Sequence, residues 1–407
     1  MTADKRGAWR PEPALIRKTT ATAGTVRAIG LMSGTSADGM DAAAVLIEGG
    51  DAPRRATKLV ALRSVPFERE LRAEILFAQE GELPLRRLFA LAVALGEVGA
   101  DAARQAHAAA AWNEPPDVIG FHGQTVFHDP RGERSGRPLT TQIGEPAVIA
   151  HALGAPVVSG FRMADVLEGG EGAPLVPRFD YNQFGSDTAD RVLLNLGGIA
   201  NLTRLPNGAP IGAITAFDCG PANMLLDGIV AALRPEGPAY DAGGALAAGG
   251  RVDEAVVREF LGHPFFARKP PKSAGREEFG AEFRARFLSR TEGRSLEDRL
   301  RTAVEITAAG VARGVEQSGP RAPDEIIVSG GGAKNVVLLD AIRARLPKSV
   351  VRTSDELGVP SEAKEAMAFA FLAAETMAGR PGNVPAATGA RKEVVLGSVT
   401  MPPDPKR

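Results

Sequence analysis

The sequence repeats one pattern at the start of each of its halves: a buried strand, a glycine-bearing turn and a second strand. The paired apolar runs are 26–32 with 42–47, and 192–196 with 199–205. Strand and helix patterns alternate after both hairpins, which is typical of α/β domains. We therefore predict an α/β fold that is internally duplicated, with weak sequence identity between the copies.

A length of 407 residues agrees with two such domains. We expect a flexible N-terminal tail over 1–25, a first domain over 26–187 and a second domain over 188–407, whose C-terminal segment is a candidate to return to the first. The net charge of -1 provides no basic field, so we expect no nucleic acid and no anionic membrane as a partner. The single Cys219 excludes an intramolecular disulfide framework and agrees with a reducing compartment.

Long apolar runs are missing from the sequence. Charged residues interrupt the most apolar helical pattern, 85–112, and residues 1–25 have no apolar signal-peptide core. These two observations predict a cytoplasmic protein.

Several common chemistries lack their sequence signatures. The chain has no P-loop motif, no G-x-G-x-x-G fingerprint, no G-x-S-x-G elbow and no H-E-x-x-H motif. Glycines and small hydroxyl residues instead follow the predicted strands, where backbone N–H groups can approach phosphate oxygens. Ordinary turns are the alternative for each single loop. In the loop 34–41, Asp38 and Asp41 add candidate ligands for Mg²⁺.

Ordered motifs along nearly the whole chain resemble the anhydro-N-acetylmuramic acid kinase family. They are Gly30-Leu31-Met32-Ser33-Gly34-Thr35-Ser36, Phe121-His122-Gly123-Gln124-Thr125, Gly172-Ala173-Pro174-Leu175-Val176-Pro177, Asn195-Leu196-Gly197-Gly198, Phe217-Asp218-Cys219-Gly220-Pro221, Pro381-Gly382-Asn383 and Thr388-Gly389-Ala390.

The resemblance implies two duplicated ribonuclease-H-like domains around a central ATP cleft, as in actin, sugar kinases and heat-shock ATPases. It implies an ATP-dependent anhydrosugar kinase of peptidoglycan recycling, with ATP and Mg²⁺ as cofactors and a homodimer as a possible assembly. Such an enzyme opens the 1,6-anhydro bridge with water while the ATP γ-phosphoryl is transferred to O6, which gives N-acetylmuramic acid 6-phosphate.

The site residues are assigned by the same resemblance and by their positions at strand ends. Asp165 maps onto the family's catalytic base, with a surface aspartate as the alternative reading. The predicted ATP-binding residues are Gly34, Thr35, Ser36, Ala37, Asp38, Gly39, Met40, Asp41, Gly197, Gly198, Gly330, Gly331 and Gly332. The predicted substrate-binding residues are His122, Gln124, Thr125, Asp218 and Glu365, and the predicted metal ligands are Asp38 and Asp41.

Two other functions stay open at the level of sequence. The same fold and base would serve a kinase of another anhydrosugar such as levoglucosan, or a regulator that binds ATP without catalysis. The sequence also departs from the family pattern at Ala37, Asp180 and Glu171. Glu171 adds a negative charge close to Asp165, which leaves the proton affinity of that carboxylate open.

Overall fold

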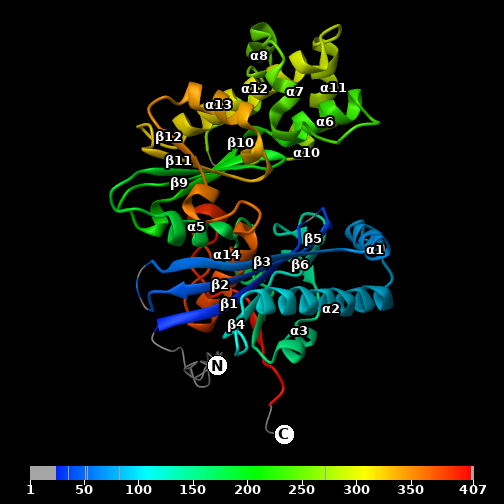
Figure 1. The fold of residues 1–407 in the computed structure, drawn as a ribbon, viewed down its shortest axis with the longest axis vertical. Coiled ribbons are helices and arrows are strands. Elements are labelled where there is room, and N and C mark those ends of the chain that lie inside the picture. The colour runs from blue at the N-terminus through cyan, green and yellow to red at the C-terminus, as the bar shows by residue number, and fades with distance from the viewer. Residues whose placement is uncertain are drawn as a thin grey trace, which may run out of the picture.

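A computed structural model of the chain describes residues 24–34, 36–50, 52, 54–81, 83–270 and 272–404. Most of the predicted tail and Thr35 lie outside the described residues. Figure 1 shows two lobes, each built on one sheet. Helices α5 (Val176–Phe184) and α14 (Lys364–Met377) lie between them.

The first sheet has six strands in the order β13-β7-β4-β1-β2-β3. Strands β1, β2 and β3 are antiparallel neighbours, β4 and β7 continue the sheet in parallel, and β13 pairs antiparallel with β7. The bounds are β1 Thr25–Met32, β2 Gly39–Glu48, β3 Ala56–Pro66, β4 Val118–Phe121, β7 Val157–Ser159 and β13 Ser398–Thr400. The C-terminal end of the chain is therefore part of the first sheet.

The second sheet repeats this arrangement in five strands, β10-β9-β8-β11-β12. Strands β8, β9 and β10 are antiparallel neighbours, and β11 and β12 continue the sheet in parallel. The bounds are β8 Arg191–Leu196, β9 Ile199–Leu205, β10 Thr215–Pro221, β11 Glu325–Ser329 and β12 Val350–Thr353. The same order and directions occur in both lobes, so the predicted duplicated α/β fold is confirmed.

Helices cover both sheets. In the first lobe, α2 packs against β2 and β3 and also against α3, whereas α14 packs against β1, β2 and β4. In the second lobe, α12 packs against β9 and β10 and also contacts α6, α8 and α13. The bounds are α1 Arg69–Gln79, α2 Leu85–Ala109, α3 Pro146–Leu153, α6 Asn223–Leu233, α8 Glu254–Phe260, α12 Leu296–Gln317 and α13 Val336–Arg345.

Several short elements lie outside the duplicated pattern and were not predicted. They are the hairpin β5 Gln124–Asp129 and β6 Leu139–Ile143, the helices α4 Met163–Leu167, α7 Ala245–Ala248, α9 Pro264–Ala267, α10 Arg276–Phe279, α11 Ala281–Arg290 and α15 Pro385–Thr388, and the 3₁₀ turns η2 Ile211–Ala213, η3 Ala242–Gly244, η4 Gly331–Lys334 and η5 Asp355–Leu357. Most of these segments are too short for a hydrophobic period to be recognised, and charged or polar residues interrupt α11, β5 and β6.

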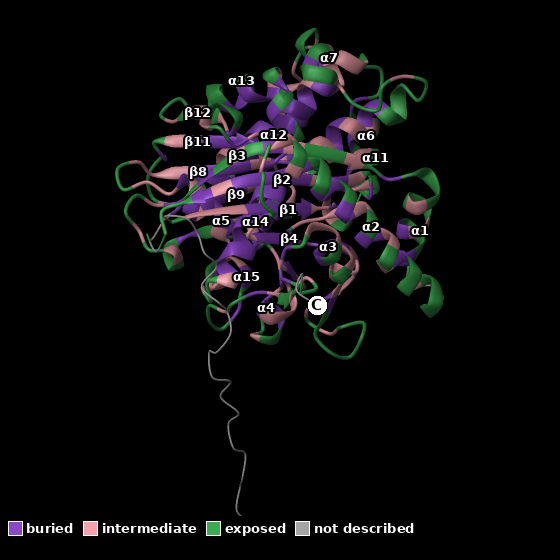
Figure 2. Cartoon of the chain, turned by 60° about the horizontal axis from the view of Figure 1, so that its bottom comes forward, coloured by how far each residue is buried: buried purple, intermediate pink, exposed green. Residues whose placement is uncertain are grey.

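Helix α14 lies unusually close to the first sheet. A β-carbon at Gly30 in β1 would overlap the carbonyl of Ala366, and one at Gly120 in β4 would overlap that of Phe369. The buried cluster around α14 also includes Leu193 and Ile327 of the second sheet. Figure 2 shows α14 as a largely buried helix, so it joins the cores of the two lobes.

None of the helices in the described part of the chain combines the length and the apolar character needed to cross a bilayer.

Candidate functional site

The candidate site begins where parallel strands end side by side. Strands β1 and β4 are parallel neighbours, and the backbone N–H of His122, just after β4, donates to the carbonyl of Leu31 in β1 at 3.0 Å. Strands β8 and β11 end in the same way before Gly197 and Gly330. Ligands of open α/β sheets bind outside the carboxyl ends of such strands. Sheet pairing therefore brings together the loops that the sequence singled out within each lobe.

Asp165, the predicted base, lies in the short helix α4 with a side chain that is 0% exposed. Its Oδ1 accepts hydrogen bonds from Asn383 Nδ2 and Thr388 Oγ1, both at 2.7 Å. Its Oδ2 accepts from the backbone N–H of Gly172 at 2.8 Å. An ionised carboxylate only accepts hydrogen bonds and has about four acceptor positions, so three donors suit this form and leave one position for a further donor. The alternative reading, a surface aspartate, is wrong for this residue.

The three donors of Asp165 come from segments far apart in the sequence. Gly172 belongs to the glycine-rich segment after α4, whereas Asn383 and Thr388 belong to the segment that follows α14. A β-carbon at Gly170 would overlap the Asp165 carboxylate, so the backbone passes directly against it. Helix α15, which ends at Thr388, also packs against β10 of the second lobe. Asp165 thus lies where the two lobes meet.

His122 is buried and uses both ring nitrogens inside the protein. Nδ1 lies 2.7 Å from the Gly123 carbonyl, and Nε2 lies 2.9 Å from Arg162 Nη2 and 3.1 Å from Arg162 Nε. A guanidinium only donates, so Nε2 accepts and Nδ1 carries the proton. Burial lowers the pKa of His122 to about 3, and the Arg162 charge contributes to this shift. His122 is therefore neutral near pH 7 and holds Arg162 in place.

Arg162 connects three parts of the site and was not singled out in the sequence. Besides contacting His122, its Nη1 donates to the Gly172 carbonyl at 2.8 Å. Burial lowers the pKa of Arg162, and the Glu365 carboxylate partly opposes that effect. Its position three residues before Asp165 is the signal that could have found it, because residues on one turn of a helix share a face.

Gln124 has both ends of its amide engaged by the first glycine loop. Its Oε1 accepts from Ser33 Oγ at 2.6 Å, and its Nε2 donates to the Gly34 carbonyl at 3.1 Å. The structure thus brings Gln124 to the loop between β1 and β2, which it holds in position. Thr125 follows in β5, where its carbonyl accepts from Gln79 at 3.3 Å.

Glu365 and Asp41 form an acidic pair of groups at the start of α14 and of β2. Glu365 is exposed to solvent, yet the surrounding protein raises its pKa. Lys364 and Arg162 lower the pKa of Glu365, and Asp41 raises it. Burial also raises the pKa of Asp41, against a hydrogen bond from Ser64. Arg162 and Asp41 therefore both lie close enough to influence the charge of Glu365, whereas Glu362 is the acidic neighbour that raises the pKa of Asp41.

The glycines of the first loop differ in whether contacts within the protein require glycine at their positions. Gly34 has an ordinary backbone conformation, and a β-carbon there would meet only Ser36 Oγ, at 3.7 Å. At Gly39 a β-carbon would lie 2.6 Å from the Val65 carbonyl of β3, so strand pairing requires that glycine. Ala37 is buried with a φ of 53°. Only Gly34 is left without a reason inside the protein, which favours a ligand at that position.

Arg72 of α1 ties down the outer part of the same loop. It donates to the carbonyls of Ala37 and Ser36 at 3.2 and 3.4 Å, and its Nη2 lies 3.1 Å from Asp38 Oδ1. Met40 is buried in the core behind the loop. Arg72 was missed in the sequence, because nothing in an exposed helix marks one arginine among several.

In the second lobe, too, the protein itself requires some of the loop glycines and not others. Gly197, Gly198 and Gly331 would each tolerate a β-carbon at ordinary contact distance. Gly330 has a φ of +83°, and a β-carbon at Gly332 would lie 2.6 Å from Leu196 Cβ. Backbone conformation and packing therefore explain these last two glycines.

Asp218 lies in β10 and is held at one oxygen. Its Oδ2 accepts from the backbone N–H of Ala274 at 2.7 Å. Burial raises the pKa of Asp218 to about 6, with a smaller increase from Glu277 and a decrease from Lys272. The described hydrogen bond of the Asp218 side chain is with the segment after residue 271 and not with Asp165 or His122.

The predicted metal ligands fit Mg²⁺ only in part. Asp38 is paired with Arg72, Asp41 binds Ser64, and no group of three or more potential ligands is found among the described residues. Mg²⁺ in kinases is typically held by one or two carboxylates together with substrate phosphates. Asp41, with Glu365 beside it, fits this pattern better than Asp38 does.

Glu171, a position close to Asp165 at which the sequence departs from the family pattern, forms an ion pair with an arginine. Its carboxylate lies 2.8 Å from Arg131 Nε in the loop between β5 and β6. Its backbone N–H donates to the Thr388 carbonyl at 2.8 Å. The extra negative charge is therefore paired, and the loop 130–138 is tied to the segment that carries Asp165.

The chain is similar in sequence to proteins of known family. The family described as anhydro-N-acetylmuramic acid kinase matches residues 26–402. Curated proteins with that name from Bacillus cereus (strain Q1) and Bacillus anthracis (strain A0248) are 40% and 39% identical, over 92% of this chain and 98% and 99% of their own lengths. A xylulose kinase structure from Rhodospirillum rubrum aligns over 93% of this chain and 95% of its own, with a TM-score of 0.42 and 13% identity.

Proposed function

Because the chain belongs to the anhydro-N-acetylmuramic acid kinase family, we propose that it opens 1,6-anhydro-N-acetylmuramic acid with water and phosphorylates O6 from ATP. The product is N-acetylmuramic acid 6-phosphate, and we place the reaction in cytoplasmic peptidoglycan recycling. The names of the relatives support this substrate over levoglucosan, and they support a catalyst over a regulator without activity. The homodimer stays a prediction.

The buried Asp165 carboxylate is the observation that carries the proposed mechanism. We assign it the proton of the water that attacks the anomeric carbon. As the C1–O bond to O6 breaks, its electron pair stays on O6, which forms a bond to the γ-phosphorus while the bond to ADP breaks. Donors from Gly172, Asn383 and Thr388 fix the direction of the carboxylate, and its fourth acceptor position is the one we assign to the water, which must be enclosed with the buried side chain.

We assign the phosphates of ATP to Gly34 in the first lobe and to Gly197 and Gly198 in the second. Packing within the protein does not require glycine at these positions, so close approach of a ligand explains them best. Bound Mg²⁺ would neutralise charge on the transferred phosphoryl group, and Asp41 with Glu365 are the residues we expect to hold its hydration shell. Arg162 would orient the substrate side of the site, with His122 as its support.

Turnover in heavy-oxygen water tests the whole proposal. With ATP, Mg²⁺ and the anhydrosugar, we expect one labelled oxygen at the anomeric hydroxyl and an unlabelled oxygen at position 6 that carries the phosphate. Mass spectrometry of product fragments distinguishes the two positions. A product without label at the anomeric carbon would exclude attack by water.

Asp165→Asn tests the base. General-base assistance contributes about 10² to 10⁴ in rate, so kcat should fall at least that far, whereas the dissociation constants of ATP and sugar should change less than about tenfold. In either orientation, the NH₂ group of the substituted amide faces a hydrogen-bond donor. This should lower the free energy of unfolding by about 1–3 kcal/mol, so thermal unfolding is measured in parallel. Glu171→Gln is the matched control and should keep near-parental kcat. A folded Asp165→Asn variant with more than about a tenth of the parental rate would identify another base.

A further inference from the structure

A cavity lies beside helices α5 and α14, and Asp165 is not among its lining residues. Its volume is about 280 Å³, slightly below the roughly 300–1,000 Å³ of sites for drug-sized ligands, so its size suits a small metabolite or ion. Helices α5 and α14 form its walls, and Ile211 of η2 contributes from the second lobe. Residues of both lobes therefore line this cavity.

Positive charge exceeds negative charge among the described residues that line the cavity. They include three arginines and two glutamates, namely Arg55, Arg178, Arg380, Glu375 and Glu393. The buried Glu375 carboxylate is shared, because Arg55 pairs with it and Arg380 Nε lies 3.2 and 3.3 Å from its two oxygens. One carboxylate thus serves two guanidinium groups.

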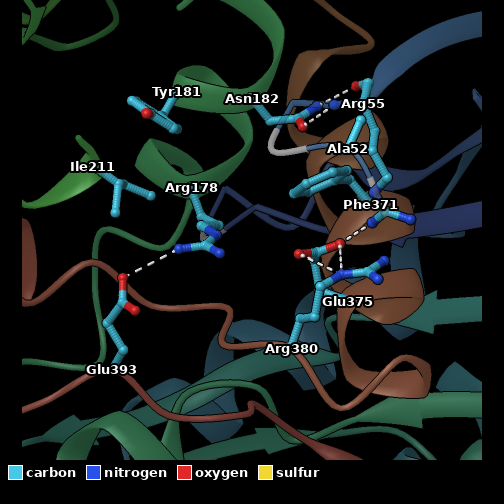
Figure 3. A pocket seen from close by; sticks show the side chains of 10 residues that line it. All are labelled: Ala52, Arg55, Arg178, Tyr181, Asn182, Ile211, Phe371, Glu375, Arg380 and Glu393. Carbon is cyan, nitrogen blue, oxygen red and sulfur yellow. Dashed lines mark hydrogen bonds and ion pairs between the residues drawn. The ribbon is translucent and has the colours of Figure 1, made fainter. Parts of the chain in front are cut away.

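Arg178 is the group that we expect to receive a ligand. Figure 3 shows its side chain extending from α5 into the cavity, between Glu393 on one side and Glu375 with Arg380 on the other. Its Nη1 donates to Glu393 at 3.2 Å, and Glu393 is 41% exposed, so solvent weakens this pair. Burial lowers the pKa of Arg178, Glu393 raises it, and the nearby Arg380 charge makes a smaller contribution that lowers it. An anion between the two arginines would relieve that repulsion.

We propose that this cavity binds a small anion with a phosphate or carboxylate group, held mainly by Arg178 and Arg380. A planar guanidinium matches both kinds of anion with two parallel hydrogen bonds. The anion would compete with Glu393 for Arg178.

Glu393 provides a path from the cavity to Asp165. The residues on either side of it bind Asn383: Asn383 Nδ2 donates to the Lys392 carbonyl at 3.1 Å, and the Val394 N–H donates to Asn383 Oδ1 at 2.7 Å. The same Asn383 Nδ2 donates to Asp165 at 2.7 Å. Movement of Glu393 would therefore change how Asp165 is held. This regulatory part rests on the proposed role of Asp165, whereas anion binding does not.

Calorimetric titration tests binding without turnover. Inorganic phosphate and citrate are titrated separately into the full chain, saturated with Mg²⁺ and a non-hydrolysable ATP analogue so that the catalytic cleft is filled. We expect saturable binding of at least one of them, which also identifies the preferred anion. Arg178→Gln should weaken it at least tenfold, and Arg380→Gln provides a second variant if the first fails to fold. The matched control is Arg54→Gln, whose arginine pairs with the exposed Asp187 outside the cavity.

Absence of saturable binding to the parent, or equal affinity in the parent and in both cavity variants, would overturn the site. The regulatory part is tested on the parent enzyme, where the bound anion should change kcat at least twofold, and this change should be lost in Arg178→Gln. Binding without any change in kcat would overturn the path to Asp165 and leave the anion site in place.

Discussion

Glycines of one sequence motif occupy their positions for different physical reasons in this protein. Gly34 has open space around its α-carbon, whereas Gly39 touches the neighbouring strand β3. Both belong to one glycine loop, and the sequence alone predicted phosphate binding for both. The difference yields a test in which the two residues control for each other.

Gly34→Val should leave the fold intact and impair the use of ATP. Apart from its chain neighbours, the described residues place only Ser36 Oγ within 4 Å of the added β-carbon, so the substitution should weaken phosphate binding rather than folding. We expect KM for ATP to rise at least tenfold in steady-state kinetics with an unchanged unfolding midpoint. Gly39→Val should do the reverse and lower the unfolding midpoint. Unaltered ATP kinetics in a folded Gly34→Val protein would remove this loop from the nucleotide site.

His122 should make stability depend on pH. Its folded pKa of about 3 lies below the unfolded value of about 6.5, so its contribution is fully present above pH 6.5 and is lost as the pH falls toward 3. Between pH 7 and pH 5 this amounts to about 2 kcal/mol of unfolding free energy. Urea denaturation of His122→Gln, which can still accept from Arg162, should show that much less loss than the parent.

The exposed His151 on α3 supplies the control for this measurement. His151→Gln should keep the parental pH dependence. Equal losses in the parent and in His122→Gln would mean that the buried imidazole is protonated at little cost.

Elements with a clear hydrophobic period were predictable, and elements defined by their neighbours were not. The sequence predicted β9 with the bounds that the structure shows, and β1 and β8 to within one residue, because each is a sustained apolar pattern closed by turn residues. Polar residues interrupt β5 and β6, and helix α4 is too short for such a pattern. The same holds for the site: motifs pointed to Asp165, but its donors Asn383 and Thr388 depend on how the C-terminal segment folds back.

Packing of α14 on the first sheet should be intolerant of larger residues. Valine is favoured in strands, yet at Gly120 its side chain would overlap the Phe369 carbonyl. We expect Gly120→Val to lower the free energy of unfolding by about 3 kcal/mol, the upper end for overpacked cores, in urea denaturation. Gly212→Ala, where no atom lies within 4 Å, should change it by less than about 0.5 kcal/mol. Equal effects of the two substitutions would contradict this packing.

The whole molecule has two lobes that share the core around α14, while the two loops that we propose to bind phosphate belong to different lobes. A ligand that contacts both loops should therefore draw the lobes together and exclude bulk water from the γ-phosphate. Small-angle scattering should show a smaller radius of gyration with the sugar and a non-hydrolysable ATP analogue. Gly34→Val at the same nucleotide concentration should contract less. An unchanged radius in the saturated parent protein would exclude closure.

The pairing of β13 with β7 also determines the order in which the two lobes are completed during translation. The strands of the second sheet are complete once Thr353 has been translated, whereas the first sheet still lacks α14 on its face and β13 at its edge. Domains generally fold as units while the chain emerges from the ribosome. In this chain the lobe that is translated first is therefore the last to be completed. Its apolar face is covered only after α14 has been translated, and its edge is paired only after β13 has been translated.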